Sequence, residues 1–317
     1  MRIVIDARFY GPYGKGLGRY TQKLIEWLER VDTDNTYIVL LRKENWDAYQ
    51  PVHPRWSKQL ADFQWYSLDE QVKLPKLLRH LHPDIVHFPH FNVPLFYRGK
   101  FVVTIHDLIL THFPTRRATT LGPLVYALKH FAYSVVIRRA IARAKKVITV
   151  SEFSRNDLIS TFHLDPSRVR VTLEGVDRVE KKHDEAASQH MSTVFHLDHP
   201  YLLYVGNAYP HKNIERLLEA FSIMAKKNFE IRLVIVGRED YFQKRIRTRA
   251  DDLGIRDRVI FPGFVNDIEL RLLYSSARAF VFPSLYEGFG LPPLEAMAAG
   301  VPVVASRVTS IPEVLGD

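Results

Sequence analysis

Short apolar runs of the kind that form buried strands alternate with amphipathic helical segments along most of the chain. The first pair consists of a strand-like run at 2–7 and, after a glycine-rich loop at 11–18, an amphipathic segment around 24–28. Strands that are joined by helices pair in parallel, because each helix returns the chain to the starting end of the sheet. The alternation therefore predicts an α/β protein built on parallel sheets. Further strands are expected at 37–41, 84–88, 101–105, 146–150 and 168–172.

The alternation is interrupted once, at 177–200, where the chain is polar and rich in histidine. A second alternating series starts at 201–206, and 317 residues suffice for two domains. We therefore predict an N-terminal Rossmann-like domain at 1–176, a linker at 177–200 and a C-terminal Rossmann-like domain at 201–317. In the C-terminal domain, helices are expected at 213–226 and 241–253, and strands at 231–237, 258–261, 279–282 and 302–305.

Composition excludes several classes of protein. Cysteine is absent, so disulfide scaffolds, thiolate zinc sites and cysteine nucleophiles are ruled out. No apolar run approaches the roughly 18 residues that a membrane span needs. The N-terminal run meets an acid at Asp6 and lacks the apolar core of a signal peptide. We therefore expect a cytoplasmic location.

The most informative segment is 282–296, where two glutamates stand eight residues apart across an expected strand, loop and helix. Glu287 lies in a loop with Gly288 and Gly290, at the strand end where open α/β sheets bind ligands. Two prolines suit the first turn of the helix, so Glu295 is expected within that turn. The glycines let backbone N–H groups approach a ligand, and the helix N-terminus favours anions. Singly, each glutamate would be an ordinary loop or helix-dipole acid, but together they favour a functional site.

This segment resembles the E-x7-E donor-site motif of retaining nucleotide-sugar glycosyltransferases with the GT-B fold, in particular glycosyltransferase family 4. Four other segments look like the family's N-terminal glycine loop, its His-Asp motif, the segment before its hinge and its phosphate-binding segment. They lie at 16–20, 103–108, 174–177 and 204–213. The resemblance covers the whole chain and leans towards mannosyltransferases. It implies two Rossmann-like domains that face a cleft, the second lacking the C-terminal helices with which the family normally continues.

The resemblance also implies a role for each matching residue. Glu287 would hydrogen-bond the donor sugar, Glu295 would accept hydrogen bonds from the ribose, and Lys212 would contact the diphosphate. Phe264 and Val265 would border the nucleobase. The implied catalytic residues are His106, Lys212 and Glu287. The implied donor-binding residues are Gly16, Asn207, Lys212, Val265, Glu287, Gly288, Phe289, Gly290, Leu291 and Glu295.

The chain departs from the family pattern at the phosphate-binding segment. The family usually pairs the lysine with an arginine, but the two positions where that arginine would stand hold Asn207 and His211. A missing cation should weaken stabilisation of the departing diphosphate, unless His211 is protonated or Arg19 or Arg238 takes its place. The departure puts the catalytic rate in doubt more than the fold.

The implied function is transfer of a hexose of the mannose or glucose type from a nucleotide diphosphate sugar to a glycan or lipid-linked acceptor. The leaving diphosphate gains negative charge, so cations and N–H donors at the phosphate are expected to contribute most to catalysis. A metal ion could supply that charge, but the only candidate, the 32–34 turn with its two aspartates, lies at the wrong end of the sheet. The resemblance implies retention of configuration and no metal or other cofactor besides the nucleotide sugar.

Positive charge is concentrated in one segment. Residues 108–151 contain eight Lys and Arg side chains and no Asp or Glu, whereas the rest of the chain is almost balanced. Within it, 121–144 mixes apolar residues with cations, as helices at membrane surfaces do. The segment would meet an anionic membrane or a phosphorylated acceptor, or it is a core-packed helix with a solvated basic end. The cations predicted to form this acceptor or membrane surface are Arg116, Arg117, Lys129, Arg138, Arg139 and Arg143. No recognised nucleic-acid motif accompanies them.

Three alternatives remain open. The chain could be a catalytically weak or inactive GT-B homologue that acts as a binding or scaffold subunit in glycan assembly. It could be a nicotinamide-dependent dehydrogenase, but no proper dinucleotide fingerprint follows the first strand. His87 and His90 could line a cleft, while a metal site there is disfavoured because no carboxylate joins them at a standard spacing.

Overall fold

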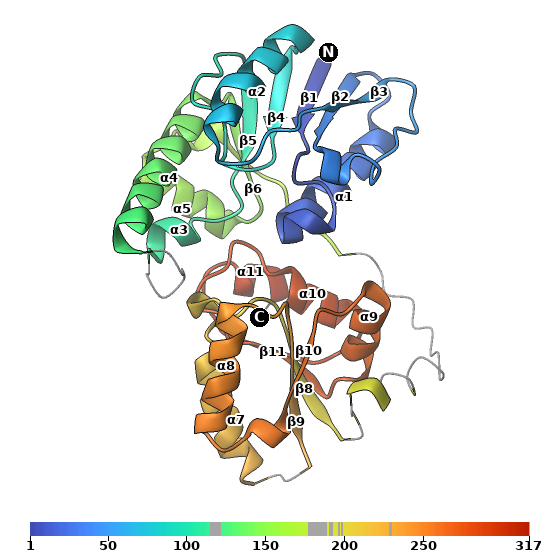
Figure 1. Cartoon of the computed structure of the whole chain (residues 1–317), viewed down its shortest axis with the longest axis vertical. Helices are drawn as coiled ribbons and strands as arrows, with labels where there is room; N and C mark the ends of the chain where they lie inside the picture. Colours follow the sequence, from blue (N-terminus) through green and yellow to red (C-terminus); the bar gives the residue numbers. More distant parts are fainter. Residues whose placement is uncertain are drawn as a thin grey trace. The chain divides into compact units, whose positions relative to one another are not determined.

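The computed structural model describes residues 1–114, 122–176, 189, 193–195, 197, 199–227 and 230–316, which form two compact units. Each unit is an α/β structure built on one parallel sheet (Figure 1). The first unit comprises Met1–Leu108, Leu124–Val150 and Arg155–Thr172. The second comprises the described residues of Ile109–Pro123, Ser151–Ser154 and Leu173–Asp317. The predicted linker at 177–200 lies largely outside the described residues, so the domain boundaries stay a prediction.

The sheet of the first unit has the strand order β3-β2-β1-β4-β5-β6-β7, and all pairs are parallel. Its strands are β1 (Arg2–Asp6), β2 (Thr36–Leu41), β3 (Trp56–Leu60), β4 (Ile85–Phe88), β5 (Phe101–Thr104), β6 (Lys146–Thr149) and β7 (Val169–Val171). The sequence did not predict β3, because its polar residues suit an edge strand and interrupt the apolar pattern.

Helices cover both faces of this sheet. The helix α1 (Lys15–Val31) packs Ile25 against one face, together with Ile5 and Val39. The opposite face carries α2 (Leu68–Leu81), α4 (Pro123–Arg143) and α5 (Glu152–Phe162), whose buried residues join the core around Val86 and Val103. The short α3 (Ile109–His112) lies in the second unit. The carboxyl ends of the strands are thus left to loops, which is where ligands bind in open α/β sheets.

A buried ion network fixes the loops at the carboxyl end of β1. Arg8 has a completely buried side chain that donates to both oxygens of Asp6 at 2.7 Å and to Glu70 Oε1 at 2.6 Å. Asn92 donates to both oxygens of Glu70, at 2.8 and 2.9 Å. Burial raises the pKa of Glu70, and the contacts with Arg8 and Asn92 oppose this rise. Burial lowers the pKa of Arg8, but Asp6 and Glu70 outweigh this effect, so the pKa of Arg8 is raised. The network ties together the chain segments that follow β1, β3 and β4.

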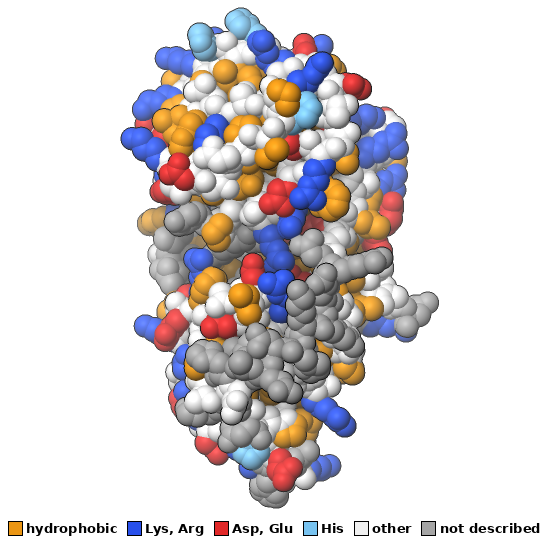
Figure 2. Space-filling model, turned by 90° about the vertical axis from the view of Figure 1, so that its right-hand side faces the viewer, with side chains coloured by type: hydrophobic (Ala, Val, Ile, Leu, Met, Phe, Trp, Pro, Cys, Tyr) orange, Lys and Arg blue, Asp and Glu red, His pale blue; other side chains and the backbone are white. Residues whose placement is uncertain are grey.

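One face of the first unit is mixed in character. On the face shown in Figure 2, its basic, acidic and hydrophobic side chains are interspersed. Within the described part of the chain, no helix is both long enough and apolar enough to cross a membrane.

The sheet of the second unit has the order β10-β9-β8-β11-β12, again with parallel pairs. Its strands are β8 (Tyr201–Val205), β9 (Arg232–Val236), β10 (Val259–Gly263), β11 (Ala279–Phe282) and β12 (Val303–Ala305). Its helices are α7 (Ile214–Ala225), α8 (Tyr241–Asp252), α9 (Asp267–Ser276), α10 (Leu291–Ala298) and α11 (Ile311–Leu315). The strands predicted for this half are all present.

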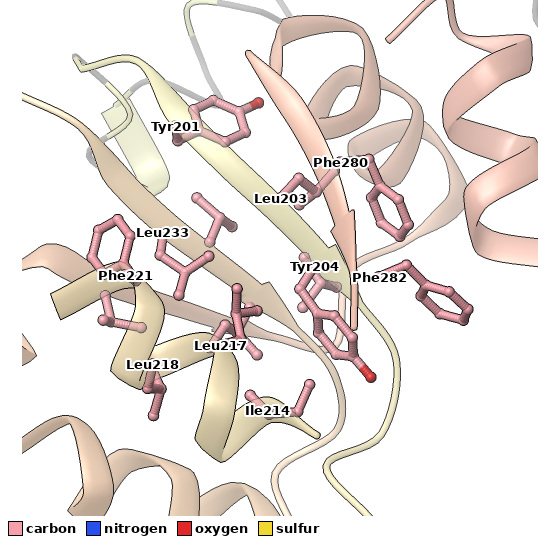
Figure 3. Packing of buried hydrophobic residues seen from close by; sticks show 14 of the residues in the cluster. Tyr201, Leu203, Tyr204, Ile214, Leu217, Leu218, Phe221, Leu233, Phe280 and Phe282 are labelled. Carbon is pink, nitrogen blue, oxygen red and sulfur yellow. The ribbon is translucent and has the colours of Figure 1, made fainter. Parts of the chain in front are cut away.

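The core of the second unit forms where α7 packs on the sheet. Ile214, Leu217, Leu218 and Phe221 recur at the spacing of one helix face and are buried. Figure 3 shows them in the same cluster as Leu203 of β8 and Leu233 of β9, among other side chains of the core. Residues of four strands and several helices enter this one cluster. Their packing fixes the strands, and therefore the positions of the loops that follow them.

We expect Arg8→Met to destabilise the first unit by about 3–5 kcal/mol, because it leaves two acids buried without their counter-charge. The free energy of unfolding from urea denaturation measures this loss. Lys73→Met is the matched control, since it breaks an exposed ion pair with Asp69 on α2, and it should cost no more than about 0.5 kcal/mol. Similar losses for the two variants would contradict this account of the buried network.

Candidate functional site

Loops gather at the carboxyl edge of the second sheet. Gly206 follows β8, Gly237 follows β9 and Pro283 follows β11. The backbones of the first two loops touch, since a Cβ on Gly237 would lie 2.4 Å from the carbonyl oxygen of Gly206. Gly237 is therefore required for the close approach of the two loops. The sequence motifs at 204–213 and 282–296 meet at this edge.

The two motifs are joined by a charged pair. Lys212 Nζ lies 2.7 and 2.9 Å from the two carboxylate oxygens of Glu287. The side chains are only 15% and 9% exposed, so the pair is largely desolvated but still reachable from solvent. The ring of Phe282 lies 5.7 Å from the ammonium group and adds a cation–π contact. An anionic ligand that binds here would compete with Glu287 for the ammonium group of Lys212.

Backbone geometry places Lys212 at this point. It ends a short 3-10 turn, Pro210–Lys212, that is closed by Asn213 in the left-handed conformation (φ 59°). The side-chain amide of Asn213 donates to the backbone carbonyl of Pro283 at 3.1 Å. The N–H of Leu285 donates to the carbonyl of His211 at 2.8 Å. These two bonds hold the lysine turn against the glutamate loop.

Serine and threonine hydroxyls fix the loop that carries Glu287. Ser310 donates to the carbonyls of Glu287 and Phe289, at 3.0 and 2.9 Å. Ser151 and Ser154, both part of the second unit, donate to the carbonyl of Gly288 at 2.7 and 3.1 Å. These serines were not predicted from the sequence, because no local motif links them to the loop. Only their placement in the fold identifies them.

The loop leads directly into α10. Gly290 has a φ of 118°, which L-residues rarely adopt, and the helix begins at the next residue, Leu291. The first N–H groups of a helix have no acceptor within it and carry a positive partial charge. The N-terminus of α10 therefore adds positive potential beside Lys212 and Glu287, as anion sites require.

The sequence predicted that Glu295 would lie in the first turn of α10, and this prediction was wrong. The first turn contains no acid, because the helix starts at Leu291 and Glu295 is its fifth residue. It is half-buried and accepts a hydrogen bond from the hydroxyl of Tyr274, at 3.1 Å. The helix dipole thus does not account for Glu295, which is instead oriented by a tyrosine of α9.

His211 does not replace the arginine that the family pattern would place beside the lysine. Burial and the adjacent charge of Lys212 lower the pKa of His211 to about 4, so the imidazole is neutral at neutral pH. Asn207 is exposed, and its carbonyl accepts a hydrogen bond from Tyr204 at 2.9 Å. Burial and the charge of Glu287 raise the pKa of Tyr204. Of the two substitute cations suggested by the sequence, Arg238 lies in this unit.

Arg238 follows β9 and is exposed, with its guanidinium 5.5 Å from the ring of Phe264. Phe264 follows β10 and is 69% exposed, whereas the side chain of Val265 is buried in the core of the unit. Of this predicted pair, Phe264 therefore presents its side chain at the edge of the sheet. Arg238 and Phe264 together offer a cation and a flat apolar ring to a ligand.

The remaining predicted site residues lie in the first unit. Gly16 is in the first turn of α1, and a Cβ there would have no neighbour within 4 Å, so packing does not demand glycine. A ring nitrogen of His106 lies 3.0 Å from the carbonyl oxygen of Pro89. Its imidazole meets the ring of Tyr20 edge-on at 4.6 Å. Gly16, Tyr20 and His106 therefore belong to the carboxyl edge of the first sheet.

The basic residues of α4 are partly used in packing. Arg139 and Arg143 donate to the carbonyls of Leu95 and Tyr97, and Arg138 lies over the ring of Phe162. Lys129 is exposed. Arg116 and Arg117 lie outside the described residues. The buried residues of α4, which are Ile137, Ala140 and Ile141, all fall in its second half.

No group of three His, Asp or Glu side chains that could hold a metal ion occurs in the described ranges. Asp32, considered above as a metal ligand, accepts hydrogen bonds from the side chains of Asn35 and Tyr37, both at 2.7 Å, and closes a turn. The expectation of a metal-independent reaction stays a prediction.

Comparison with known proteins identifies both halves of the chain. Residues 14–180 match the family model described as Glycosyltransferase Family 4, and residues 187–317 match the model described as Glycosyl transferases group 1. The O-antigen chain mannosyltransferase RfbU of Salmonella typhimurium is 25% identical over 99% of this chain and 84% of its own length. The O-antigen chain mannosyltransferase B of Escherichia coli is 32% identical over 86% of this chain, which spans 65% of that relative.

Solved structures show the same fold at lower identity. HepE from Anabaena, in complex with UDP and glucose, has a TM-score of 0.72 at 19% identity and covers 100% of this chain and 83% of its own. WaaG, a glycosyltransferase involved in lipopolysaccharide biosynthesis, has a TM-score of 0.70 at 18% identity and covers 98% of this chain and 82% of its own. Both likenesses concern the fold alone.

We expect the neutral state of His211 to appear in the pH dependence of stability. Its folded-state pKa of about 4 lies below the ordinary value of 6.5, so its contribution is present above pH 6.5 and is lost as the pH falls towards 4. At pH 4 the loss is on the order of 3 kcal/mol. Urea denaturation between pH 7 and pH 4 should therefore show a shallower decline for His211→Gln than for the wild type.

The exposed His80 on α2 provides the control. His80→Gln should follow the wild-type pH profile. A His211→Gln variant with the same slope as the wild type would show that His211 does not titrate in this window.

Proposed function

The chain belongs to glycosyltransferase family 4, and on this premise we propose that it transfers a mannosyl group from a nucleoside diphosphate sugar to a growing glycan. Two curated relatives are O-antigen chain mannosyltransferases, which supports mannose as the sugar and a polysaccharide as the product. The observation that carries the proposal is the Lys212–Glu287 pair beside the N-terminus of α10. It joins a cation, a carboxylate and helical N–H groups within one site.

In this proposal, the second unit binds the donor. Lys212 and the N-terminus of α10 meet the diphosphate, because both supply positive potential. Glu287 accepts hydrogen bonds from hydroxyls of the sugar, and Glu295 accepts them from the ribose. Phe264 offers its exposed ring to the base. HepE structures are complexes with UDP and glucose or with UDP-glucose, which supports a nucleotide sugar as the donor class.

The chemical step asks for positive charge at the leaving group. The bond between the anomeric carbon and the diphosphate oxygen breaks, and its electron pair leaves with the diphosphate. The oxygen of the acceptor hydroxyl forms the new bond to that carbon, and its proton passes to the departing diphosphate. Lys212 stabilises the leaving charge without a metal ion, since its ammonium lies on a flexible stem that can leave Glu287 for the phosphate. Glu287 is freed to bind the sugar at the same moment. We propose retention of configuration from the family resemblance.

A second function is favoured by the missing arginine. With a neutral His211 and with Asn207 at the other position, Lys212 is the only fixed cation of the family's phosphate pair. A protein that binds the nucleotide sugar but transfers it slowly would act as a binding subunit in glycan assembly. Measured turnover with bound donor separates this function from transfer.

We further propose that α4 rests on the inner face of a membrane that presents a lipid-linked acceptor. The first half of the helix exposes four large apolar side chains together with Lys129. They are Leu124, Val125, Leu128 and Phe131, with exposed fractions of 87%, 49%, 69% and 68%. A helix that was packed in the core would bury them. Apolar residues interspersed with cations and lacking acids suit an anionic lipid surface.

The donor proposal predicts thermal stabilisation by nucleotide sugars. GDP-mannose or a UDP- or dTDP-sugar at about a hundred times its Kd should add about 2.7 kcal/mol and raise the melting temperature by several degrees. Glu295→Ala should abolish most of the shift, whereas Asp252→Ala, which changes an exposed acid at the end of α8, should not. EDTA should leave the shift intact. A wild-type protein that responds to no nucleotide sugar would exclude a donor site of this kind.

The membrane proposal predicts that Leu128→Glu with Phe131→Glu will reduce co-sedimentation with vesicles of phosphatidylcholine and phosphatidylglycerol at least about tenfold. Each of the two side chains contributes about 1.5–3 kcal/mol when it is buried. The control is Ile223→Glu on α7, which is 63% exposed in the second unit. Equal co-sedimentation of all three proteins would refute docking through α4.

A further inference from the structure

Tyr66 combines exposure with a backbone conformation that aromatic residues rarely adopt. Its φ is 59°, in the left-handed region, and its side chain is 62% exposed. Such a conformation costs on the order of 1–3 kcal/mol for a bulky residue, whereas glycine or asparagine adopts it easily. Strain of this kind is kept where the side chain has a use. The exposed ring is thus a candidate contact for a ligand.

The buried ion network holds Tyr66 in place. Its N–H donates to Glu70 Oε2 at 2.9 Å, and the same carboxylate binds Arg8 and Asn92. Glu70 is completely buried at the start of α2, where the Ser67 hydroxyl caps the helix by accepting the Glu70 N–H at 3.2 Å. The turn that carries Tyr66 therefore cannot relax without disturbing a buried charge.

Other rings gather beside Tyr66 at the carboxyl edge of the first sheet. His90 and Phe91, which follow β4, have ring centroids 6.3 Å from that of Tyr66. Phe9, which follows β1, stacks on Trp65 at 4.3 Å. This is the edge of the sheet where open α/β folds bind ligands.

Two ring nitrogens in this group lack a partner. Trp65 Nε1 and His90 Nδ1 are buried, and within the described residues neither has a hydrogen-bond partner. Native proteins leave few buried polar atoms unpaired, since each costs about 1–3 kcal/mol. Burial also lowers the pKa of His90 to about 3, so its ring is neutral. The protein alone therefore leaves polar atoms beside Tyr66 unsatisfied.

The cations of this group are paired with acids of the protein. Arg8 is shared between Asp6 and Glu70, and Arg42, which lies 4.9 Å from the Trp65 ring, is bound by both oxygens of Glu44 at 3.1 Å. These cations are therefore committed, and a phosphate would gain little here. An uncharged ligand with an apolar face and a polar rim fits better, and a pyranose ring has that form.

We propose that the Tyr66 ring is the stacking floor of a subsite for a pyranose of the acceptor glycan, with the unpaired nitrogens of Trp65 and His90 beside it. The proposal rests on the proposed function, which supplies a glycan acceptor. The apolar C–H face of the sugar packs on the tyrosine ring by dispersion and exclusion of water. Desolvation by neighbouring groups and the charge of Glu70 raise the pKa of Tyr66, so the hydroxyl stays protonated and able to donate.

The test is saturation-transfer NMR of the full chain with α-linked mannotriose, maltotriose and cellotriose at millimolar concentration. The wild type should bind at least one of them, and Tyr66→Gly should weaken that binding by about tenfold, as expected for loss of a stacked ring. Glycine fits the left-handed backbone and keeps the N–H bond to Glu70, so this variant should melt no lower than the wild type. Tyr66→Phe, which keeps the ring, should retain most of the binding. Tyr241→Ala, at an exposed tyrosine of α8, is the matched control and should have no effect.

Equal binding by the wild type and Tyr66→Gly would overturn the proposal. Failure of the wild type to bind any of the three sugars, while a nucleotide sugar still raises its melting temperature, would overturn the subsite and leave the donor function standing. Sugar binding that depends on Tyr66 without any nucleotide response would support the subsite and count against the proposed transferase function.

Discussion

A charged side-chain pair with little solvent exposure lies where the strands of each sheet end, and both candidate sites depend on these pairs. Taking an ion out of water costs several kcal/mol, and only a close opposite charge with further hydrogen bonds offsets that cost. Each pair therefore fixes the loops that supply its partners. Arg8 is enclosed between two acids and cannot change partner, so its role is to hold loops in place. Lys212 keeps 15% of its side chain exposed and can turn from Glu287 to an incoming anion.

The positive charge available at the carboxyl edge of the second sheet depends on the protonation state of His211. His211 stands beside Lys212, yet burial keeps it neutral, so the position that the family pattern reserves for a second cation contributes no charge. Positive potential must then come from Lys212, from the N-terminus of α10 and from the exposed Arg238. A hydrogen bond of Asn213 to the carbonyl of Pro283 holds the backbone turn that carries Lys212, whereas the Arg238 guanidinium lies 5.5 Å from the ring of Phe264.

Much of the fold was predictable because it rests on local patterns. The apolar runs of both sheets and the amphipathic face of α7 stand in the sequence, and the glutamate motif indicated the site. The predictions that were wrong or missing concern features that depend on long-range structure. The edge strand β3 has no apolar run, and Glu295 lies in the second turn because the backbone of Gly290 delays the start of α10. The pairing of Lys212 with Glu287 across 75 residues, and the serines that fix the glutamate loop, arise only when the loops meet at one sheet edge.

The two sheet edges differ in chemistry, and this difference argues for two kinds of ligand. The second edge joins a cation, a carboxylate and a helix N-terminus, which suit a charged nucleotide sugar. At the first edge, Arg8 is already paired with Asp6 and Glu70, and the exposed group is an aromatic ring on a strained backbone. A single ligand would need only one such edge. A reaction between an anionic donor and a neutral glycan needs both edges. In the proposed subsite, the Tyr66 ring binds the neutral glycan, which the charged edge does not recognise, and this role explains why the strained conformation is kept.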